Sequence, residues 1–160
     1  MSDTSKKTII LFSGDLDKVL AAFVIANGAA AMGDDVTIFF TFWGLNVLRK
    51  PEKVAVSGKN VLQKAFAGMM PRGADKLAMS RMNFGGAGPR LMKKMMRDNN
   101  VSSIADFIAM AKDQDIKFIA CTMSMDVMGI TREELIDGLE FAGVATYLGE
   151  ADEANVNLFI

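Results

Sequence analysis

A short apolar run that ends on the only cysteine does most to limit what this chain can fold into. Residues 116–121 read IKFIAC, with Lys117 as the one charged position. A strand that is apolar on both faces is typical of a parallel sheet covered by helices on each side. The run therefore predicts a buried strand with Cys121 at its carboxyl end, the edge at which open α/β sheets bind ligands.

Two earlier runs repeat the pattern and frame a long apolar segment. Residues 7–12 (KTIILF) predict a first strand and residues 36–42 (VTIFFTF) a second. Residues 16–32 between them are apolar on nearly every face, which predicts a helix covered on all sides. Polar residues interrupt this segment too often for a membrane span. We expect the helix to lie between the sheet and a second subunit.

The rest of the chain continues the alternation of strands and helices. The patterns predict helices near residues 60–67, 89–97, 104–111 and 133–139, and strands at 143–148 and 156–160. This alternation predicts a three-layer α/β/α, flavodoxin-like sandwich with a mostly parallel five-stranded sheet. We expect one domain over residues 1–160, with an insertion at about 49–97 that projects from the sheet.

The absence of histidine excludes several kinds of active site. Ser-His-Asp and Cys-His nucleophile-base pairs, HExxH zinc sites and histidine proton shuttles all require it. The single cysteine also rules out an intrachain disulfide, CxxC redox chemistry and a zinc ribbon, and it fits a reducing compartment. We expect no metal and no cofactor, so any covalent chemistry must use the lone thiol without a histidine base.

Net charge and hydropathy limit which classes of partner and which cellular compartment we expect for this chain. The net charge of −1 gives no overall attraction to nucleic acid, and we expect none to bind. The hydrophobic content of 51% suggests a buried oligomer interface or a membrane-facing surface. Residues 1–7 lack the basic-then-apolar order of a signal peptide, so we expect the mature chain to begin here and the protein to be cytoplasmic.

The insertion is rich in methionine and in positive charge. Between Gly68 and Arg97, seven lysines and arginines face one carboxylate, Asp75. Thioethers can ligate Cu(I), but methionine is more often an adaptable packing or interface residue. Phe84 is the only aromatic residue here, so stacking on single-stranded nucleic acid is poorly supported. Three interpretations stay open: a solvated face, a landing site for an acidic partner or small anion, and self-association with the acidic C-terminal third.

Cys121 is the candidate nucleophile, and inert packing is the alternative. Cysteine is among the most buried residue types, so a lone thiol in an apolar strand is often part of the core. Here the thiol ends a strand, and the backbone of Thr122, Met123 and Ser124 can direct free N–H groups at the sulfur, which stabilises a thiolate. The carboxylate of Asp126 would oppose this effect at close range.

Two loops at the same edge of the sheet are expected to line the site. The loop after the first strand can offer backbone N–H groups to an anion, although an ordinary capped βα turn is the simpler interpretation. It consists of Ser13, Gly14 and Asp15. The loop after the second strand contributes Trp43, Gly44 and Asn46.

Several segments together resemble a known family. SGDLDK and TIFFTFWGLNVL around the first two strands, ACTMSMDVMGI around Cys121, and GVATYL with NLFI near the end are similar, in order and spacing, to the DsrE/DsrF/DsrH-like sulfur-transfer proteins, in particular the DsrE2-like branch. The resemblance covers nearly the whole chain. It implies a flavodoxin-like domain, usually oligomeric, that carries sulfane sulfur as a persulfide on a cysteine at a strand end. That role transfers to Cys121 alone.

The resemblance also implies partners and sets the functional hypotheses. It implies sulfur exchange with rhodanese-like and TusA-like proteins and a homo-oligomer, and it leaves open a peripheral membrane contact through the insertion. Some relatives have a second cysteine that this chain lacks, which puts a two-thiol relay within one subunit in doubt. The leading hypothesis is a sulfur carrier or sulfurtransferase. The alternatives are a non-catalytic module that binds a nucleotide, coenzyme A or another anion, and an assembly protein that docks through the insertion.

Overall fold

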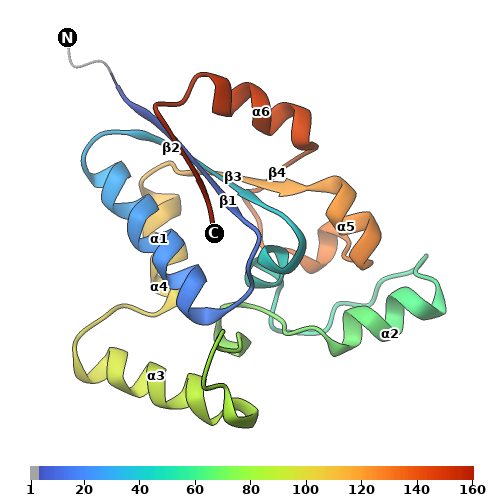
Figure 1. Cartoon of the computed structure of the whole chain (residues 1–160). Helices are drawn as coiled ribbons and strands as arrows, with labels where there is room; N and C mark the ends of the chain where they lie inside the picture. Colours follow the sequence, from blue (N-terminus) through green and yellow to red (C-terminus); the bar gives the residue numbers. More distant parts are fainter. Residues whose placement is uncertain (1–3) are drawn as a thin grey trace.

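Side chains along each strand alternate between two faces of one central sheet, and helices cover both faces. The computed structural model describes residues 4–160 and has a five-stranded sheet in which all neighbouring strands are parallel (Figure 1). The strands are β1 (Lys6–Leu11), β2 (Asp35–Phe40), β3 (Lys117–Cys121), β4 (Glu140–Ala142) and β5 (Val156–Phe159), in the order β4-β3-β2-β1-β5. The predicted α/β sandwich is confirmed, and so is an edge strand near the C-terminus.

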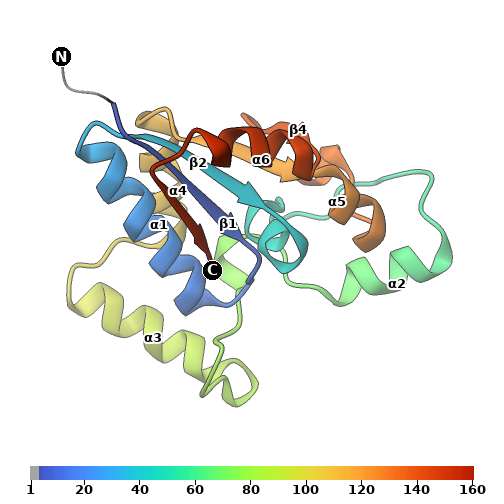
Figure 2. The ribbon, with the colours of Figure 1, turned by 45° about the horizontal axis from the view of Figure 1, so that its top comes forward.

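The main core lies between the sheet and two helices, α1 (Leu16–Ala31) and α4 (Ile104–Asp113). Figure 2 shows α6 (Val144–Asp152) on the opposite face of the sheet from these two helices. Phe40 and Phe118 point into the main core and pack against Phe23 of α1. Neighbouring positions on the strands point the other way, so that Phe39 and Cys121 belong to a smaller cluster under α6.

The insertion contributes two helices and several turns. They are α2 (Val61–Met69), α3 (Ala87–Asp98), and the 3₁₀ turns η2 (Ala74–Lys76) and η3 (Phe84–Gly86), and Figure 1 shows both helices at the margin of the molecule. The predicted helices near 60–67, 89–97 and 104–111 are confirmed as α2, α3 and α4. Buried side chains of the insertion, Ala67, Met70 and Leu77, join the main core.

The prediction of a strand at 143–148 is wrong, because these residues begin α6. The β-branched and aromatic residues of GVATYL favour a strand locally. In the structure Tyr147 is the only buried side chain of α6, and its ring lies 5.0 Å from that of Phe39. Val144 and Leu148, one helical turn apart, are exposed on the outer face. Packing of Tyr147 against Phe39 therefore accompanies a helix here in place of the strand that local propensity favours.

The prediction of a helix at 133–139 is also wrong. Only a 3₁₀ turn, η4 (Arg132–Glu134), forms, and the chain is extended from Leu135 before it reaches β4. The Lys50 N–H donates to the carbonyl of Glu134 and the Ile136 N–H donates to that of Leu48. This antiparallel bridge between Leu135 and Arg49 ends the 3₁₀ turn at Glu134, so the capping pattern at Thr131 starts no α-helix.

Two further expectations concern membranes and the N-terminus. No helix within residues 4–160 is both long enough and apolar enough to cross a bilayer. The sequence predicts no signal peptide in the polar segment 1–7. Residues 1–3 of this segment lie outside the described residues.

Candidate functional site

Cys121 lies at the carboxyl end of β3, where the strand turns directly into the short helix α5 (Thr122–Met128). Its backbone is extended (φ −70°, ψ 113°), and it is the N-cap residue of α5. The residue is 2% exposed, so the thiol is buried. The sequence placed the thiol at the strand end correctly, and the structure adds that the sulfur lies below the surface.

Two hydroxyl groups connect Cys121 to the neighbouring strand. The Ser124 hydroxyl donates a hydrogen bond to Cys121 Sγ over 3.4 Å. Ser124 Oγ also lies 2.7 Å from Thr41 Oγ1, and both side chains are buried. Because Ser124 has one proton to donate, Thr41 supplies the proton of the second hydrogen bond. The order of donation is therefore Thr41 to Ser124 to Cys121.

Thr41 was not among the predicted site residues. The register of the parallel sheet pairs Phe40 with Ala120, so the next residue on each strand, Thr41 and Cys121, lie side by side. The signal in the sequence is a hydroxyl-bearing residue near the carboxyl end of the apolar run 36–42. It becomes informative only when β2 is known to neighbour β3.

The thiol shares its cluster with large apolar side chains. The cluster contains Phe39, Ile119 and Tyr147, with Ala142 packed at its edge. The Tyr147 hydroxyl lies within hydrogen-bond distance of Thr8 Oγ1, at 3.0 Å, which anchors α6 to the sheet. A reagent or ligand therefore reaches the Cys121 sulfur only after part of this covering layer moves.

The loop after β1 satisfies its own polar groups. The Ser13 N–H donates to the carbonyl of Ile160 and the Leu16 N–H donates to that of Ala78. The Ser13 hydroxyl bonds to the Asp15 carboxylate at 3.2 Å and accepts weakly from the Asp15 N–H at 3.4 Å. The N–H groups of Ser13, Asp15 and Leu16 therefore have partners within the fold. Asp15 is the N-cap of α1 but makes no side-chain hydrogen bond to the helix, so the predicted side-chain cap is wrong.

Two glycines let this loop meet the loop after β2, η1 (Phe42–Leu48). A Cβ on Gly44 would lie 2.0 Å from the carbonyl oxygen of Leu11, and a Cβ on Gly14 would lie 2.7 Å from that of Trp43. The two loops are therefore in contact. Their glycines are needed for close approach of the backbones.

The remaining predicted site residues point in different directions. Trp43 is partly exposed, and its ring packs 6.1 Å from that of Phe66 in α2. Asn46 is buried, and its carbonyl accepts from the N–H of Gly73 in the insertion. Met123 is exposed, whereas Thr122 is half-buried. Of the predicted residues, the described hydrogen bonds connect only Ser124 to the cysteine.

A family model covers almost the whole chain. The model of the DsrE/DsrF/DrsH-like family matches residues 3–159. This chain belongs to that family.

Two relatives of this DsrE-like chain match it over nearly its full length. The uncharacterized protein YrkE of Bacillus subtilis (strain 168) is 54% identical over 157 residues, which is 98% of each chain. The sulfur carrier protein DsrE2 of Allochromatium vinosum is 34% identical over 163 residues, which is 99% of each. The sequence resemblance to the DsrE2-like branch is thus confirmed.

Solved structures confirm the fold of this DsrE-like chain. The ychN protein of E. coli matches with a TM-score of 0.53 and 12% identity, covering 97% of this chain and 99% of that one. The protein MTH1491 of Methanobacterium thermoautotrophicum, whose function is unknown, matches with a TM-score of 0.57 and 12% identity, covering 96% and 98%.

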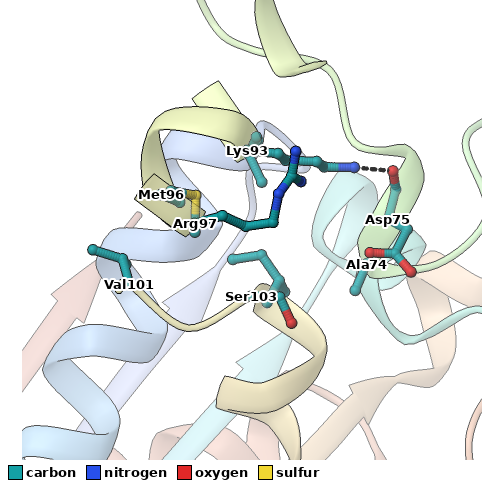
Figure 3. A pocket seen from close by; sticks show the side chains of 9 residues that line it. Ala74, Asp75, Lys93, Met96, Arg97, Val101 and Ser103 are labelled. Atoms are coloured by element: carbon teal, nitrogen blue, oxygen red, sulfur yellow. Dashed lines mark hydrogen bonds between the residues drawn. The ribbon is translucent and has the colours of Figure 1, made fainter. Parts of the chain in front are cut away.

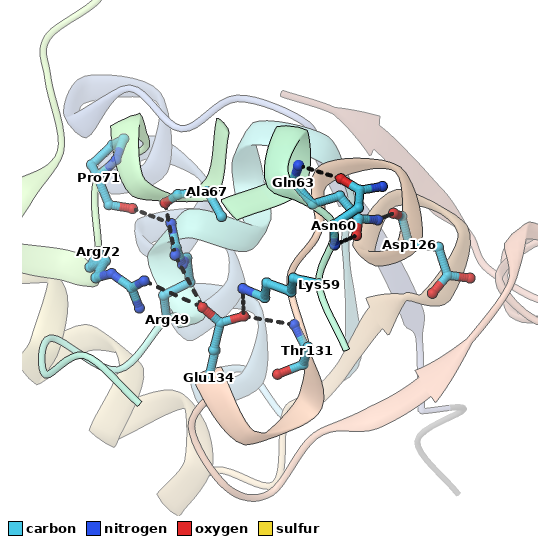
Figure 4. Close-up of polar contacts among 10 residues, drawn as sticks. All are labelled: Arg49, Lys59, Asn60, Gln63, Ala67, Pro71, Arg72, Asp126, Thr131 and Glu134. Atoms are coloured by element: carbon cyan, nitrogen blue, oxygen red, sulfur yellow. Dashed lines mark hydrogen bonds and ion pairs between the residues drawn. The ribbon is translucent and has the colours of Figure 1, made fainter. Parts of the chain in front are cut away.

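A buried ion cluster ties the insertion to the core of the DsrE-like fold. Figure 4 shows the carboxylate of Glu134 with three cations around it. Lys59 Nζ lies 2.6 Å from the carboxylate, Arg49 Nη2 3.3 Å and Arg72 Nη2 3.4 Å. Arg49 also donates to the carbonyls of Ala67 and Pro71. Since Arg49, Lys59 and Arg72 all belong to the segment 49–97, the cluster fixes that segment against Glu134 of η4.

A separate cavity of about 130 Å³ lies on the α1 and α4 side of the sheet. Lys93, Met96 and Arg97 of α3 line it, together with Asp75 and Ser103 (Figure 3). Lys93 Nζ bonds to the backbone carbonyl of Asp75, and Ser103 caps α4. Within residues 4–160 no three His, Cys, Asp or Glu side chains gather to form a metal site.

Proposed function

We propose that this protein is a sulfur carrier that accepts sulfane sulfur as a persulfide on Cys121 and passes it to an acceptor thiol. The observation that carries the proposal is the position of the only cysteine at the carboxyl end of β3, with the Ser124 hydroxyl bonded to its sulfur. Membership of the DsrE/DsrF/DrsH-like family and the full-length match to a sulfur carrier support it.

The chemistry needs no histidine and no oxidant. The Cys121 thiolate attacks the outer sulfur of a donor persulfide, the S–S bond of the donor breaks, and its electron pair leaves on the donor thiolate. The product is Cys121 with a terminal sulfane sulfur. An acceptor thiolate then attacks that terminal sulfur, and Cys121 leaves as a thiolate. Each step exchanges one S–S bond for another, so no net oxidation occurs.

Ser124 and Thr41 are suited to hold the sulfur in its anionic form. A hydroxyl that donates to a charged acceptor makes a stronger hydrogen bond than one between neutral groups. Ser124 donates to Cys121 Sγ from within the buried layer, where water does not compete. In this proposal Ser124 is a positioning residue, and Thr41 orients its hydroxyl.

Partners and compartment stay predictions. We propose that rhodanese-like proteins supply the sulfur and that TusA-like proteins accept it, in the cytoplasm. Whether the protein only carries sulfur or speeds its transfer is part of the same proposal, because a carrier and a sulfurtransferase share the Cys121 persulfide.

The direct test is the intact mass of the reduced protein after incubation with polysulfide or thiosulfate. We expect the wild type to gain one or more sulfur atoms and to lose them when dithiothreitol is added. The Cys121→Ser variant should gain none. A short incubation in mild denaturant, which opens the layer over the buried thiol, should speed loading. Loading that persists in Cys121→Ser would overturn the proposal, as would a wild type that never loads.

The burial of Cys121 favours one alternative, a binding module in which the thiol only packs. Such a module would take a nucleotide, coenzyme A or another anion at the edge of the sheet formed by the loops after β1 and β2. Thermal unfolding with a panel of these ligands separates the two functions. Equal stabilisation of wild type and Cys121→Ser by one ligand, without sulfur loading of the wild type, would support the binding module.

A further inference from the structure

The insertion contains an apolar groove that the proposed sulfur chemistry does not use. The groove has a volume of about 180 Å³ and lies between α3 and the loop before it. Its main lining residues are Met79, Met82, Phe84, Leu91, Met92 and Met95. Four of its six large side chains are thioethers, which adapt their shape to a bound surface more easily than branched side chains do.

Most of the large side chains that line the groove are exposed to solvent. Phe84 is 72% exposed, Met82 67%, Leu91 58% and Met95 44%. Single exposed apolar residues are ordinary, but these four line one hollow. A contiguous exposed apolar patch of this kind marks a binding surface.

Helix α3 combines this apolar face with a basic one. Pro89 and Met96 are buried and attach the helix to the fold. Leu91 and Met95, four residues apart, face the groove. The other side of the helix is basic and consists of Arg90, Lys93, Lys94 and Arg97. Lys94, three residues from Leu91, and Arg90, one turn before Lys94, lie nearest the groove on the helix surface. Lys93 and Arg97 instead line the separate cavity of about 130 Å³.

Much of this positive charge has no carboxylate nearby. Lys94 pairs with Asp98. Among the described residues, no carboxylate lies within ion-pair distance of Arg81, Arg90 or Arg97. A surface with unpaired cations beside an apolar groove is complementary to a ligand that is both acidic and apolar.

We propose that this groove docks an acidic amphipathic segment of another protein, with apolar side chains in the groove and carboxylates along α3. An amphipathic helix in a groove places apolar anchors one turn apart, which matches the spacing of Leu91 and Met95. The hollow shape favours a protein segment over the flat surface of a bilayer. The proposal stands whether or not Cys121 carries sulfur.

A second copy of this chain fits the groove less well. Several carboxylates of its acidic C-terminal third are already paired within the subunit. Glu134 binds Arg49, Lys59 and Arg72, and Glu150 binds Lys6 and Lys117. These groups are not free to meet the basic face of α3.

The test uses methyl-labelled methionine in the full chain and a synthetic peptide as the probe. The peptide is a helix of roughly 16 residues with leucine at positions spaced i, i+3, i+4 and i+7 and glutamate elsewhere. Binding should shift the methyl resonances of Met79, Met82, Met92 and Met95, which line the groove. The methyls of Met110 in α4 and Met123 in α5 serve as internal controls.

Variants separate the two parts of the surface. Leu91→Ser with Met95→Ser removes exposed apolar contacts, and Arg90→Glu with Lys94→Glu reverses charge at exposed positions. We expect each pair to weaken peptide binding at least about tenfold. The matched control, Leu62→Ser with Lys64→Glu on the exposed face of α2, should bind like the wild type. The same peptide with lysine in place of glutamate should not bind.

Three results would overturn the proposal. The first is no methyl shift at peptide concentrations on the order of 1 mM, well above the dissociation constant of a weak complex. The second is binding that the groove variants leave unchanged. The third is binding to a membrane instead of the peptide. If vesicles of phosphatidylcholine and phosphatidylglycerol broaden the methyl resonances of the groove methionines and the peptide does not shift them, the surface is a lipid contact.

Discussion

The Ser124 hydroxyl lies 3.4 Å from Cys121 Sγ and donates to it, although the two residues belong to different elements of the fold. Their separation of three residues lets the first turn of α5 bring the hydroxyl back over the end of β3. Thr41, the residue after β2, bonds to the same hydroxyl from the neighbouring chain segment. A thiol that looks like a lone core residue in the sequence thus has a polar partner in the structure.

We expect Ser124→Ala to slow the reaction of Cys121. Loss of the donor removes a hydrogen bond that favours the thiolate, and such a bond to a charged group is worth about 1.5–3 kcal/mol. Alkylation by iodoacetamide and sulfur loading at pH 7 should both fall by about tenfold or more. Rates equal to those of the wild type would show that Ser124 has no part in the chemistry.

Thr41→Val provides the matched comparison for the second hydroxyl. Valine keeps the shape of threonine but cannot orient the Ser124 hydroxyl, so the effect on alkylation should have the same direction and be smaller. The double variant should be no slower than Ser124→Ala alone, because Thr41 acts through Ser124. A double variant whose losses simply add would contradict this order of donation.

We expect Gly44→Ala to destabilise the protein strongly. The new Cβ would lie 2.0 Å from the Leu11 carbonyl oxygen, so the loops after β1 and β2 would have to separate. A cost of about 3 kcal/mol or more is expected for backbone strain of this kind. Chemical denaturation measures it. The control is Gly149→Ala in α6, which meets no atom within 4 Å and should gain about 0.5–1 kcal/mol in helix stability.

We expect Glu134→Gln to cost about 3–5 kcal/mol at neutral pH, because it leaves buried cations without their counter-ion. Glu153→Gln serves as the control, since Glu153 pairs with Lys6 at an exposed position and its loss should change stability by less than about 0.5 kcal/mol. A small effect of Glu134→Gln on urea denaturation would show that the cluster contributes little.

The same cluster predicts a pH dependence. Burial alone would raise the pKa of Glu134, but the hydrogen bonds from Lys59 and the Thr131 N–H, with the charges of Lys59 and Arg49, outweigh it and hold the pKa below its ordinary value of 4.5. The stabilisation is therefore complete above pH 4.5 and is lost as the pH falls through the lower pKa of the folded state. Below that pKa, wild type and Glu134→Gln should have similar free energies of unfolding. A difference in unfolding free energy that stays constant with pH would contradict the role given to the Glu134 carboxylate.

The outer face of α1 is where we expect a second subunit. Val24 of α1 is 49% exposed, and Ile25 (42%) and Met32 (84%), the residue after the helix, line a hollow together with Val156 and Leu158 of β5. Sedimentation should show an oligomer for the wild type and smaller species for Val24→Glu with Ile25→Glu. The control Leu62→Glu, at an exposed position of α2, should leave the assembly unchanged. A monomeric wild type would remove this interface.

The sequence by itself determined the elements whose signal is local and strong. Continuous apolar runs predicted β1, β2 and β3, and helical spacing with a serine cap predicted α4, where Ser103 indeed bonds to the Asp106 N–H. The end of β3 at Cys121 follows from the same run. These features depend on residues that are close in the chain, so a pattern can reveal them.

Only the tertiary structure decided the features that depend on distant residues. The chain leaves a helical pattern after Glu134 because its backbone pairs with residues 48–50, and Tyr147 of α6 packs on Phe39. Thr41 joins Cys121 only through the register of β2 and β3. Burial of a charge or a ring depends on partners far along the chain, so the spacing of neighbouring residues holds no information about it.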